Sequence, residues 1–125
     1  MFDHLNFRVS NISASKAFYT AILTPLGHQI LVERHDSGVA GYGSSSVKLW
    51  VRPATAEKPA AGPLHFALEA KERAEVDAFH AAGLKAGGKS NGEPGERTYA
   101  PFVYAAFLID PDGNNIECVC RKPPA

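Results

Sequence analysis

Hydrophobic and polar residues alternate in several short segments of the chain, which is the pattern of strands that bury one face. The alternation is regular in residues 4–9 (HLNFRV) and 64–69 (LHFALE). Further strands are predicted near residues 29–34, 39–42, 47–51, 85–90, 103–109 and 115–120. The chain is therefore rich in short strands, and the pattern is least regular at 85–90.

Two segments have the apolar spacing of helices instead. Apolar residues between Ala14 and Ile22 recur every three or four positions, and Ser13 is the predicted N-cap. Val76, Phe79 and Gly83 have the same spacing in the second half of the chain. Each predicted helix follows one of the two regular strands.

The two halves of the chain repeat one another. Setting residue 4 over residue 65 also places Ala17-Phe18 over Ala78-Phe79 and Gly27 over Gly88. Each half consists of a strand, a helix and three further strands, and a proline-rich segment separates the halves. We therefore predict a single α+β domain over residues 1–125, with module 1 at about 1–52, a linker at 53–62 and module 2 at about 63–121.

The last strands of the two halves can be superposed by their apolar faces, and Lys48 then lies over Glu117. Five residues fall on the opposite, more polar face of the predicted strands, namely His4, His65, Glu117, Lys48 and Trp50. We infer that His4, His65 and Glu117 converge on the inner wall of a curved sheet. Two histidines and one carboxylate can hold iron with open positions or a catalytic zinc.

The remaining histidines have no such placement. His28, His35 and His80 fall at helix ends, in loops or on a helix surface, so they are interpreted as structural or solvated. Cys118 and Cys120 lie two residues apart on one strand face, a spacing that suits neither a disulfide nor a zinc knuckle. They are predicted to be reduced and to lie in the core.

Composition limits the partners of the protein. The chain is 45% apolar and 21% charged, and 13 basic residues balance 13 acidic ones, so neither a nucleic acid nor an anionic membrane is expected as a partner. No apolar stretch has the length of a membrane span, and the first residues lack the features of a signal peptide. The expected location is the cytoplasm.

Three segments together give the chain a family resemblance, namely "HLNFRVSNISASKAFYTAIL", "LHFAL" and "DPDGNNIE". With them the sequence resembles the vicinal oxygen chelate superfamily, which includes glyoxalase I, bleomycin-resistance proteins, fosfomycin-resistance transferases and extradiol dioxygenases. The resemblance covers essentially the whole chain. It implies two βαβββ modules that form a cupped mixed sheet around a metal, and chains that pair as homodimers.

The resemblance also implies a function. It places metal ligands at His4, His65 and Glu117, where a divalent metal (iron, manganese, nickel or zinc) would act as a Lewis acid on a small-molecule substrate with adjacent oxygens. Lys48 or Trp50 stands where glyoxalase I-like members have a fourth ligand, usually a carboxylate. Neither side chain can accept the proton in an isomerisation, so glyoxalase I itself is disfavoured and another lyase or a dioxygenase is expected.

Other residues are candidates for contact with the substrate. Tyr104 could orient or protonate a bound oxygen, with a plain wall aromatic as the alternative. Lys48 could neutralise a phosphonate, and Trp50 and Phe102 would favour a flat ligand. The glycine-rich segment 87–102 is predicted to be an exposed loop, either a flexible connector or one that brings Arg97 and Tyr99 to the substrate.

A second class of function remains open. In a metal-free protein of the bleomycin-resistance type, the cup would sequester a small molecule, and the triad residues would only form hydrogen bonds. His65→Ala would then leave ligand affinity within a few fold, whereas in the enzyme it would abolish metal uptake.

Overall fold

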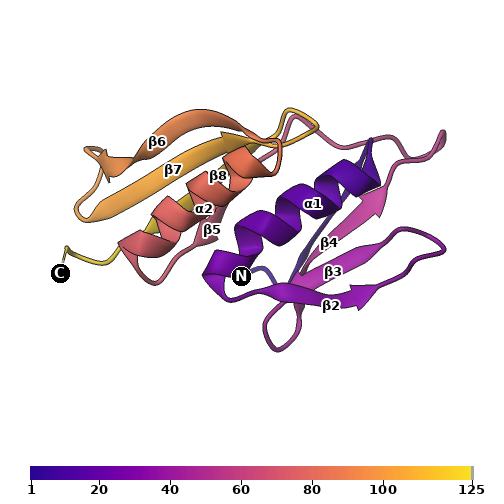
Figure 1. The fold of residues 1–125 in the computed structure, drawn as a ribbon, viewed down its shortest axis with the longest axis horizontal. Coiled ribbons are helices and arrows are strands. Elements are labelled where there is room, and N and C mark those ends of the chain that lie inside the picture. Colours follow the sequence, from indigo (N-terminus) through magenta and orange to yellow (C-terminus); the bar gives the residue numbers. More distant parts are fainter. Residues whose placement is uncertain (125) are drawn as a thin grey trace.

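The computed structural model describes residues 1–124 as two βαβββ modules, each a four-stranded sheet with one helix packed on it (Figure 1). The predicted α+β class and the two modules are confirmed. Module 1 contains β1 (Leu5–Val9), α1 (Ile12–Leu23), a short 3₁₀ helix η1 (Thr24–Leu26), β2 (Gln29–Glu33), β3 (Ala40–Gly43) and β4 (Val47–Pro53). Module 2 contains β5 (His65–Glu69), α2 (Arg73–Lys85), β6 (Lys89–Arg97), β7 (Val103–Ile109) and β8 (Asn115–Cys120).

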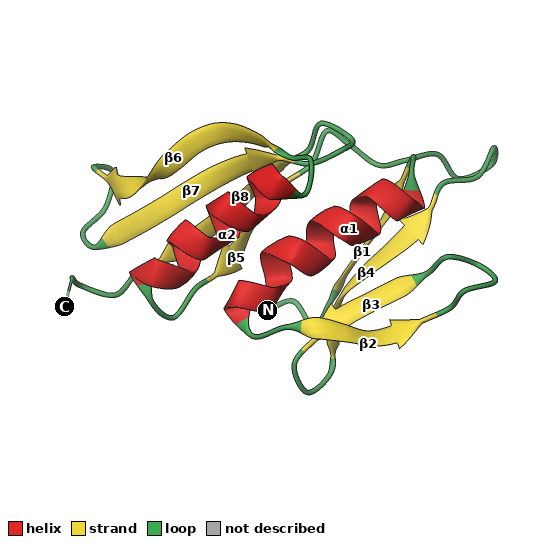
Figure 2. Ribbon diagram, in the orientation of Figure 1, coloured by secondary structure: helices red, strands yellow, loops and turns green. Residues whose placement is uncertain are grey.

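The two sheets have the same topology. The strand order is β1-β4-β3-β2 in module 1 and β5-β8-β7-β6 in module 2. The first and last strands of each module are parallel neighbours, and all other pairs are antiparallel. Both helices lie on the same side of the molecule, next to one another, and the sheets lie behind them (Figure 2). The outer faces of both sheets are therefore turned away from the helices.

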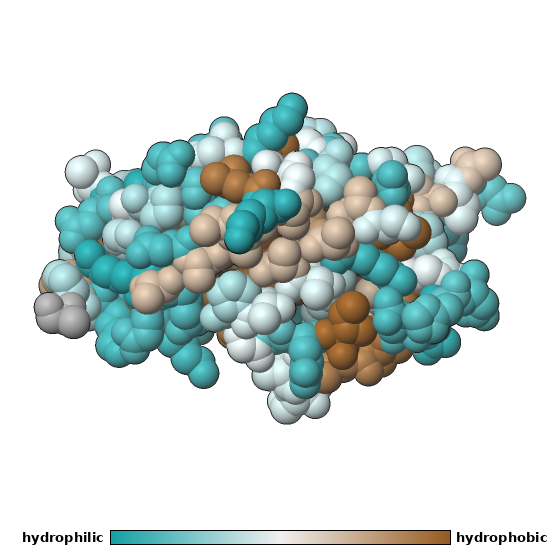
Figure 3. Space-filling view, viewed as in Figure 1, coloured by the Kyte–Doolittle hydropathy of each residue, from teal (hydrophilic) through white to brown (hydrophobic). Residues whose placement is uncertain are grey.

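The core fills the space between helices and sheets. Phe18 and Ile22 of α1 and Phe79 of α2 are fully buried there, and each contributes about 1.5–3 kcal/mol by leaving water. Cys118 and Cys120 are free and buried in the same core, as predicted. Burial raises the pKa of the Cys118 thiol to about 12. The surface over the helices carries a band of weakly hydrophobic residues between hydrophilic ones, and a strongly hydrophobic patch lies near β2 (Figure 3).

A buried carboxyl group joins the two modules. Asp110, at the turn between β7 and β8, accepts a hydrogen bond of 2.5 Å from the Tyr19 hydroxyl of α1. It also accepts from the backbone of Asp112 and from both the backbone and the side chain of Asn114. Burial, followed by the charge and hydrogen bond of Asp110, raises the pKa of Tyr19. Asp112 accepts a further bond from the backbone of Ser10 at 2.8 Å.

Two local predictions were wrong. The N-cap of α1 is Asn11, whose side chain accepts from the Ala14 amide at 3.1 Å, and Ser13 lies inside the helix. The segment predicted as an exposed loop at 87–102 is mostly β6, which pairs with β7 across register shifts between Ser90 and Gly95. β6 is an edge strand, where bulges and a proline are tolerated, so its glycine-rich sequence did not indicate a strand.

The length and composition of the helices decide whether either could cross a membrane. Within residues 1–124, no helix is both long enough and apolar enough to span a membrane.

Candidate functional site

His65 and Glu117 form the centre of the candidate site. They lie on β5 and β8, the parallel pair in which Ala67 is opposite Glu117. Alternation along both strands directs Phe66 and Cys118 toward the core and leaves His65 and Glu117 on the outer face. The distance from His65 Nε2 to Glu117 Oε1 is 3.3 Å. A carboxylate in the middle of an apolar strand thus has a histidine as its neighbour.

The hydrogen bond on the other side of the imidazole fixes what His65 can do. Its Nδ1 lies 2.9 Å from the carbonyl oxygen of Asn115, and because a carbonyl can only accept, Nδ1 must donate. In the neutral ring Nε2 is then an acceptor that faces the carboxylate of Glu117, which is also an acceptor. A proton or a cation between the two atoms removes this repulsion.

The spacing of the pair suits a shared metal ion. Two donor atoms with bonds of about 2.1 Å at a right angle lie about 3.0 Å apart, close to the separation of the two side chains. Metal-binding histidines commonly donate their other nitrogen to a backbone carbonyl, as His65 does to Asn115. The side chain of Glu117 is only 12% exposed, so water competes weakly for it.

His4, the third predicted ligand, is not joined to this pair. Its Nδ1 contacts the Asp3 carboxylate at 2.7 Å, and half of its side chain is exposed. This hydrogen bond, and secondarily the charge of Lys48, lowers the pKa of Asp3. No group of three histidine, cysteine, aspartate or glutamate side chains that could hold a metal occurs within residues 1–124.

A cavity of about 540 Å³ lies between the modules, within the size range of small-molecule sites. Its polar lining includes His4 and Lys48 from module 1 and His65 from module 2. Its wall is largely apolar and includes Leu5, Leu23, Leu49, Phe66 and Leu68. His4 of module 1 and His65 of module 2 therefore line the same cavity, although the two side chains do not contact one another.

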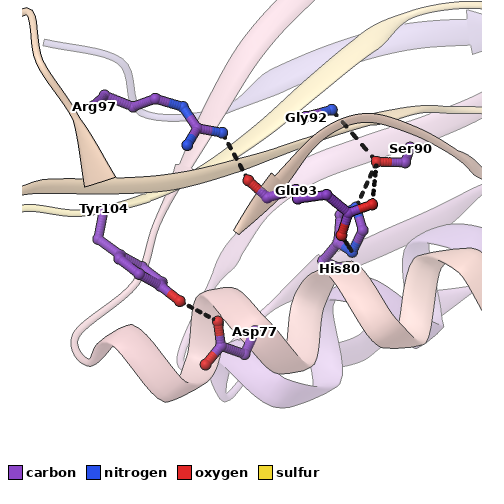
Figure 4. A network of polar contacts seen from close by, with 7 residues as sticks. All are labelled: Asp77, His80, Ser90, Gly92, Glu93, Arg97 and Tyr104. Atoms are coloured by element: carbon purple, nitrogen blue, oxygen red, sulfur yellow. Dashed lines mark hydrogen bonds and ion pairs between the residues drawn. The ribbon is translucent and has the colours of Figure 1, made fainter. Parts of the chain in front are cut away.

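Tyr104 is not at the site, contrary to the catalytic role predicted for it. The register pairs Tyr104 with Cys120, so it shares the face that packs against α2. Its hydroxyl donates to Asp77 of α2 at 2.6 Å (Figure 4). This hydrogen bond is the main cause that raises the pKa of Tyr104. Its ring also contacts the guanidinium of Arg73, 5.0 Å from the ring centroid.

Phe107 takes the place on the outer face where an aromatic side chain was expected. It lies opposite Glu117, and its ring stacks on His65 with centroids 6.3 Å apart and planes 22° apart. Phe107 was not among the predicted contact residues, although its separation from Tyr104 by three residues puts the two on opposite faces of one strand. Strand parity was the signal that could have identified Phe107.

The other predicted contact residues of module 2 lie farther from the pair. Arg97 donates to the carbonyl oxygen of Glu93 at 2.8 Å (Figure 4). It also donates to that of Gly95 at 3.0 Å and lies over the Phe107 ring. Tyr99 and Phe102 are in the turn between β6 and β7, where they are 65% and 55% exposed, and neither lines the cavity. Of these three residues, only Arg97 approaches the site, through Phe107.

The predicted contacts of module 1 are on its outer face. Trp50 is half-buried on β4, with Arg52 beside it at 5.5 Å from the indole centroid to Cζ. Lys48 is exposed on the same strand and lines the cavity.

His80, interpreted as a surface or structural histidine, is buried against β6. It is 4% exposed, and its Nε2 lies 2.8 Å from the Ser90 hydroxyl, with the Glu93 carboxylate beyond (Figure 4). The contact ties α2 to the edge strand, so a structural role is retained and a surface location is corrected.

The comparison with protein families decides the affiliation of the chain. The model of the glyoxalase/bleomycin resistance protein/dioxygenase superfamily matches residues 1–118. The chain belongs to this superfamily. The resemblance inferred from the three sequence segments is thereby confirmed.

Solved structures of the superfamily share the fold. A glyoxalase/bleomycin resistance protein from Albidiferax ferrireducens is 32% identical with a TM-score of 0.81, over 98% of this chain and 99% of that one. A glyoxalase/bleomycin resistance protein/dioxygenase family enzyme from Burkholderia phytofirmans is 19% identical with a TM-score of 0.70, over 95% and 97%. Lactoylglutathione lyase from Agrobacterium tumefaciens is 18% identical with a TM-score of 0.65, over 96% and 92%. No curated protein matches.

Members of the superfamily typically bind a divalent metal, and the residues of this chain fit one in part. His65 and Glu117 supply two donors with suitable spacing and an ordered imidazole. The third predicted donor, His4, is bonded to Asp3. Two donors do not by themselves form a three-ligand site, so the described residues of one chain fit a metal only in part.

Proposed function

We propose that the protein is a metal-dependent enzyme acting on a small molecule with adjacent oxygens, and that it works as a homodimer in the cytoplasm. The observation that carries the proposal is the His65–Glu117 pair, in which two acceptor atoms 3.3 Å apart face one another on the outer face of module 2. A proton on Nε2 or a metal cation between the two atoms relieves this contact, and the proposal is that a divalent metal takes this place. When bound, a divalent metal would supply Lewis-acid polarisation of the substrate oxygens.

The third ligand in this proposal is His4 from a second copy of the chain. His4 and His65 belong to different modules, and the two are equivalent by the internal repeat. A twofold homodimer can place module 1 of one copy against module 2 of the other, which forms two identical sites at once. The largely apolar wall of the cavity supports a metal site that is shielded from water in the proposed homodimer.

The roles of the other side chains follow from their chemistry. Asn115 holds His65 in the form with Nε2 free, and Phe107 limits rotation of its ring. Lys48, next to His4, carries a positive charge and cannot accept a proton, so isomerisation of the glyoxalase I type is disfavoured. Another lyase reaction or a dioxygenase reaction fits this charge better. Iron, manganese, nickel and zinc all suit the proposed ligands.

Metal content tests the proposal. Purified protein should contain close to one metal ion per chain by inductively coupled plasma mass spectrometry, and Glu117→Ala and His65→Ala should contain almost none. Glu69→Ala is the matched control, because Glu69 is an outward-facing carboxylate of the neighbouring strand β5 and its removal should leave metal content unchanged. If the unaltered protein takes up no metal even after anaerobic reconstitution, the enzyme is excluded and a metal-free binding protein is the better description.

A mixing experiment tests the shared site. His4→Ala and Glu117→Ala proteins each lack one ligand in every site, but a heterodimer of the two contains one site with all three ligands if the site spans both chains. Co-refolded and isolated heterodimer should therefore bind one metal ion per dimer. If the ligands came from a single chain, both sites of the heterodimer would be incomplete and no metal would bind.

A further inference from the structure

The outer face of module 1 carries an aromatic surface with charged residues beside it. On the parallel pair β1 and β4, Asn6 is opposite Trp50 and Arg8 is opposite Arg52. The Trp50 indole lies across β3 at Gly41, where an added Cβ would come within 2.8 Å of indole Cζ3. Only glycine at position 41 leaves room for the ring to lie flat on the sheet. Trp50 thus presents a broad, half-buried apolar surface.

Arg8 and Arg52 place two like charges directly opposite one another. Side chains of like charge at paired strand positions destabilise a sheet. Neither guanidinium has a carboxylate within 4.0 Å among residues 1–124, whereas Lys16 and Arg73 elsewhere pair with Glu33 and Glu96. Within the described residues, no carboxylate therefore compensates these two positive charges.

The two arginines are nevertheless held in place. Arg8 Nη1 donates to the carbonyl oxygen of Pro53 at 2.9 Å, and Arg52 Nε donates to Asn6 Oδ1 at 3.1 Å. Both side chains are partly buried, and each keeps further N–H groups free of these bonds. Guanidinium groups bind carboxylate and phosphate oxygens through paired hydrogen bonds, and an anion on this face would compensate the uncompensated charge of the two side chains.

We propose that this face binds a planar ring that bears an anionic group, with the ring stacked on Trp50 and the anion held by Arg8 and Arg52. The proposal deepens the proposed function, on which it rests for the statement that this ligand is the substrate. Arg8 is four residues from His4 along β1, or about 13 Å. The substrate class is therefore an extended conjugated or aromatic acid, whose anionic end is remote from the oxygens that reach His4.

The test uses naphthalene-2-carboxylate and its neutral analogue naphthalene-2-carboxamide as probes. Trp50 is the only tryptophan in the chain, so its indole N–H gives a single, assigned signal in a ¹H–¹⁵N spectrum. Titrations are made in the presence of EDTA, so that binding does not depend on a metal. We expect the carboxylate to bind at least tenfold more tightly than the carboxamide, and both to shift the indole signal.

Substitutions locate the effect. Arg52→Gln should reduce the tenfold preference to less than twofold while leaving carboxamide affinity unchanged, which also shows that the variant is folded. Arg34→Gln, a change of an exposed arginine elsewhere in module 1, should keep the preference. Trp50→Leu, followed by ligand-detected spectra, should weaken both probes alike.

The outcomes separate this proposal from the proposed function. Equal affinity for the two probes, or a preference that survives Arg52→Gln, would overturn the anion site whatever the metal content is. A protein that binds no metal but keeps the arginine-dependent preference would refute the enzyme and leave the anion site standing as the ligand site of a binding protein.

Discussion

Modules 1 and 2 have the same fold and the same strand order but differ on their outer faces. The outer face of module 1 is cationic and aromatic, with Arg8, Arg52 and Trp50. The outer face of module 2 carries the His65–Glu117 pair. The helix-facing sides of both sheets are alike, because packing under a helix demands apolar residues at alternate positions. The repeated fold therefore fixes the core, while the outer faces are free to acquire different chemistry.

The modules differ also in the turn before the last strand. In module 2 this turn contains the buried Asp110, which accepts hydrogen bonds from Tyr19 of module 1 and from its own turn. In module 1 the corresponding turn is Ser44–Ser46, which is exposed. The joint between the modules is thus asymmetric, since module 2 supplies the buried group.

The largest expected effect on stability comes from removing that group. Asp110→Ala leaves the buried Tyr19 hydroxyl and the Asn114 side chain without their acceptor, so it should lower the free energy of unfolding by about 4 kcal/mol. Ser45→Ala, in the exposed turn of module 1, should change it by less than about 0.5 kcal/mol. Urea unfolding measures both. Similar costs for the two variants would show that the turns are equivalent.

A second comparison concerns pH. Cys118 has a folded pKa of about 12 against an ordinary value of 9.0, and Leu49, its equivalent in module 1, does not titrate. Because the unfolded chain loses the proton first, the stabilisation is complete below pH 9 and falls as pH rises toward 12. Between pH 8 and 10.5 the loss from this thiol should be about 2 kcal/mol.

Cys118→Ala isolates this contribution. Urea unfolding of the variant should show a smaller loss between pH 8 and 10.5, by about 2 kcal/mol, although the variant starts from a lower stability. The raised pKa of Tyr19 acts in the same direction above pH 10, but it is common to both proteins. An unchanged pH dependence would mean that the Cys118 thiol ionises as readily in the folded as in the unfolded chain.

The smallest effect is expected from the tyrosines that tie each sheet to its own helix. Tyr42 of β3 contacts Thr20 and the Lys16 carbonyl of α1, and Tyr104 of β7 donates to Asp77 of α2. Tyr104→Phe should cost less than about 1 kcal/mol, and the more buried Tyr42→Phe somewhat more. Metal content should be unchanged in both variants. Loss of metal in Tyr104→Phe would instead support the role at the metal site that was predicted for Tyr104.

Much of the fold could be predicted from sequence, because alternation and the repeat both act locally. β7 and β8 have the predicted bounds, 103–109 and 115–120. The strand predicted at 85–90 covers only the start of β6 (Lys89–Arg97), because an edge strand with bulges tolerates glycine and proline and its pattern then resembles a loop. The N-cap was placed at Ser13 and not Asn11, since both residue types cap helices and periodicity alone does not choose between them.

The site was less accessible to sequence analysis. The repeat brought His65 to attention, and superposing the last strands brought Glu117, and the two lie together. Tyr104 was assigned to the wrong face because strand parity was not applied to it. The proposed convergence of His4 with the pair depends on how modules and chains are placed relative to one another, which no local pattern encodes.

The flat position of Trp50 over Gly41 links two positions that differ in exposure. Gly41 is buried and cannot touch a ligand, yet any larger residue there would tilt the indole above it. In related chains, residues 41 and 50 are therefore expected to vary together. A change at buried position 41 would alter which ligands bind on the residue at position 50.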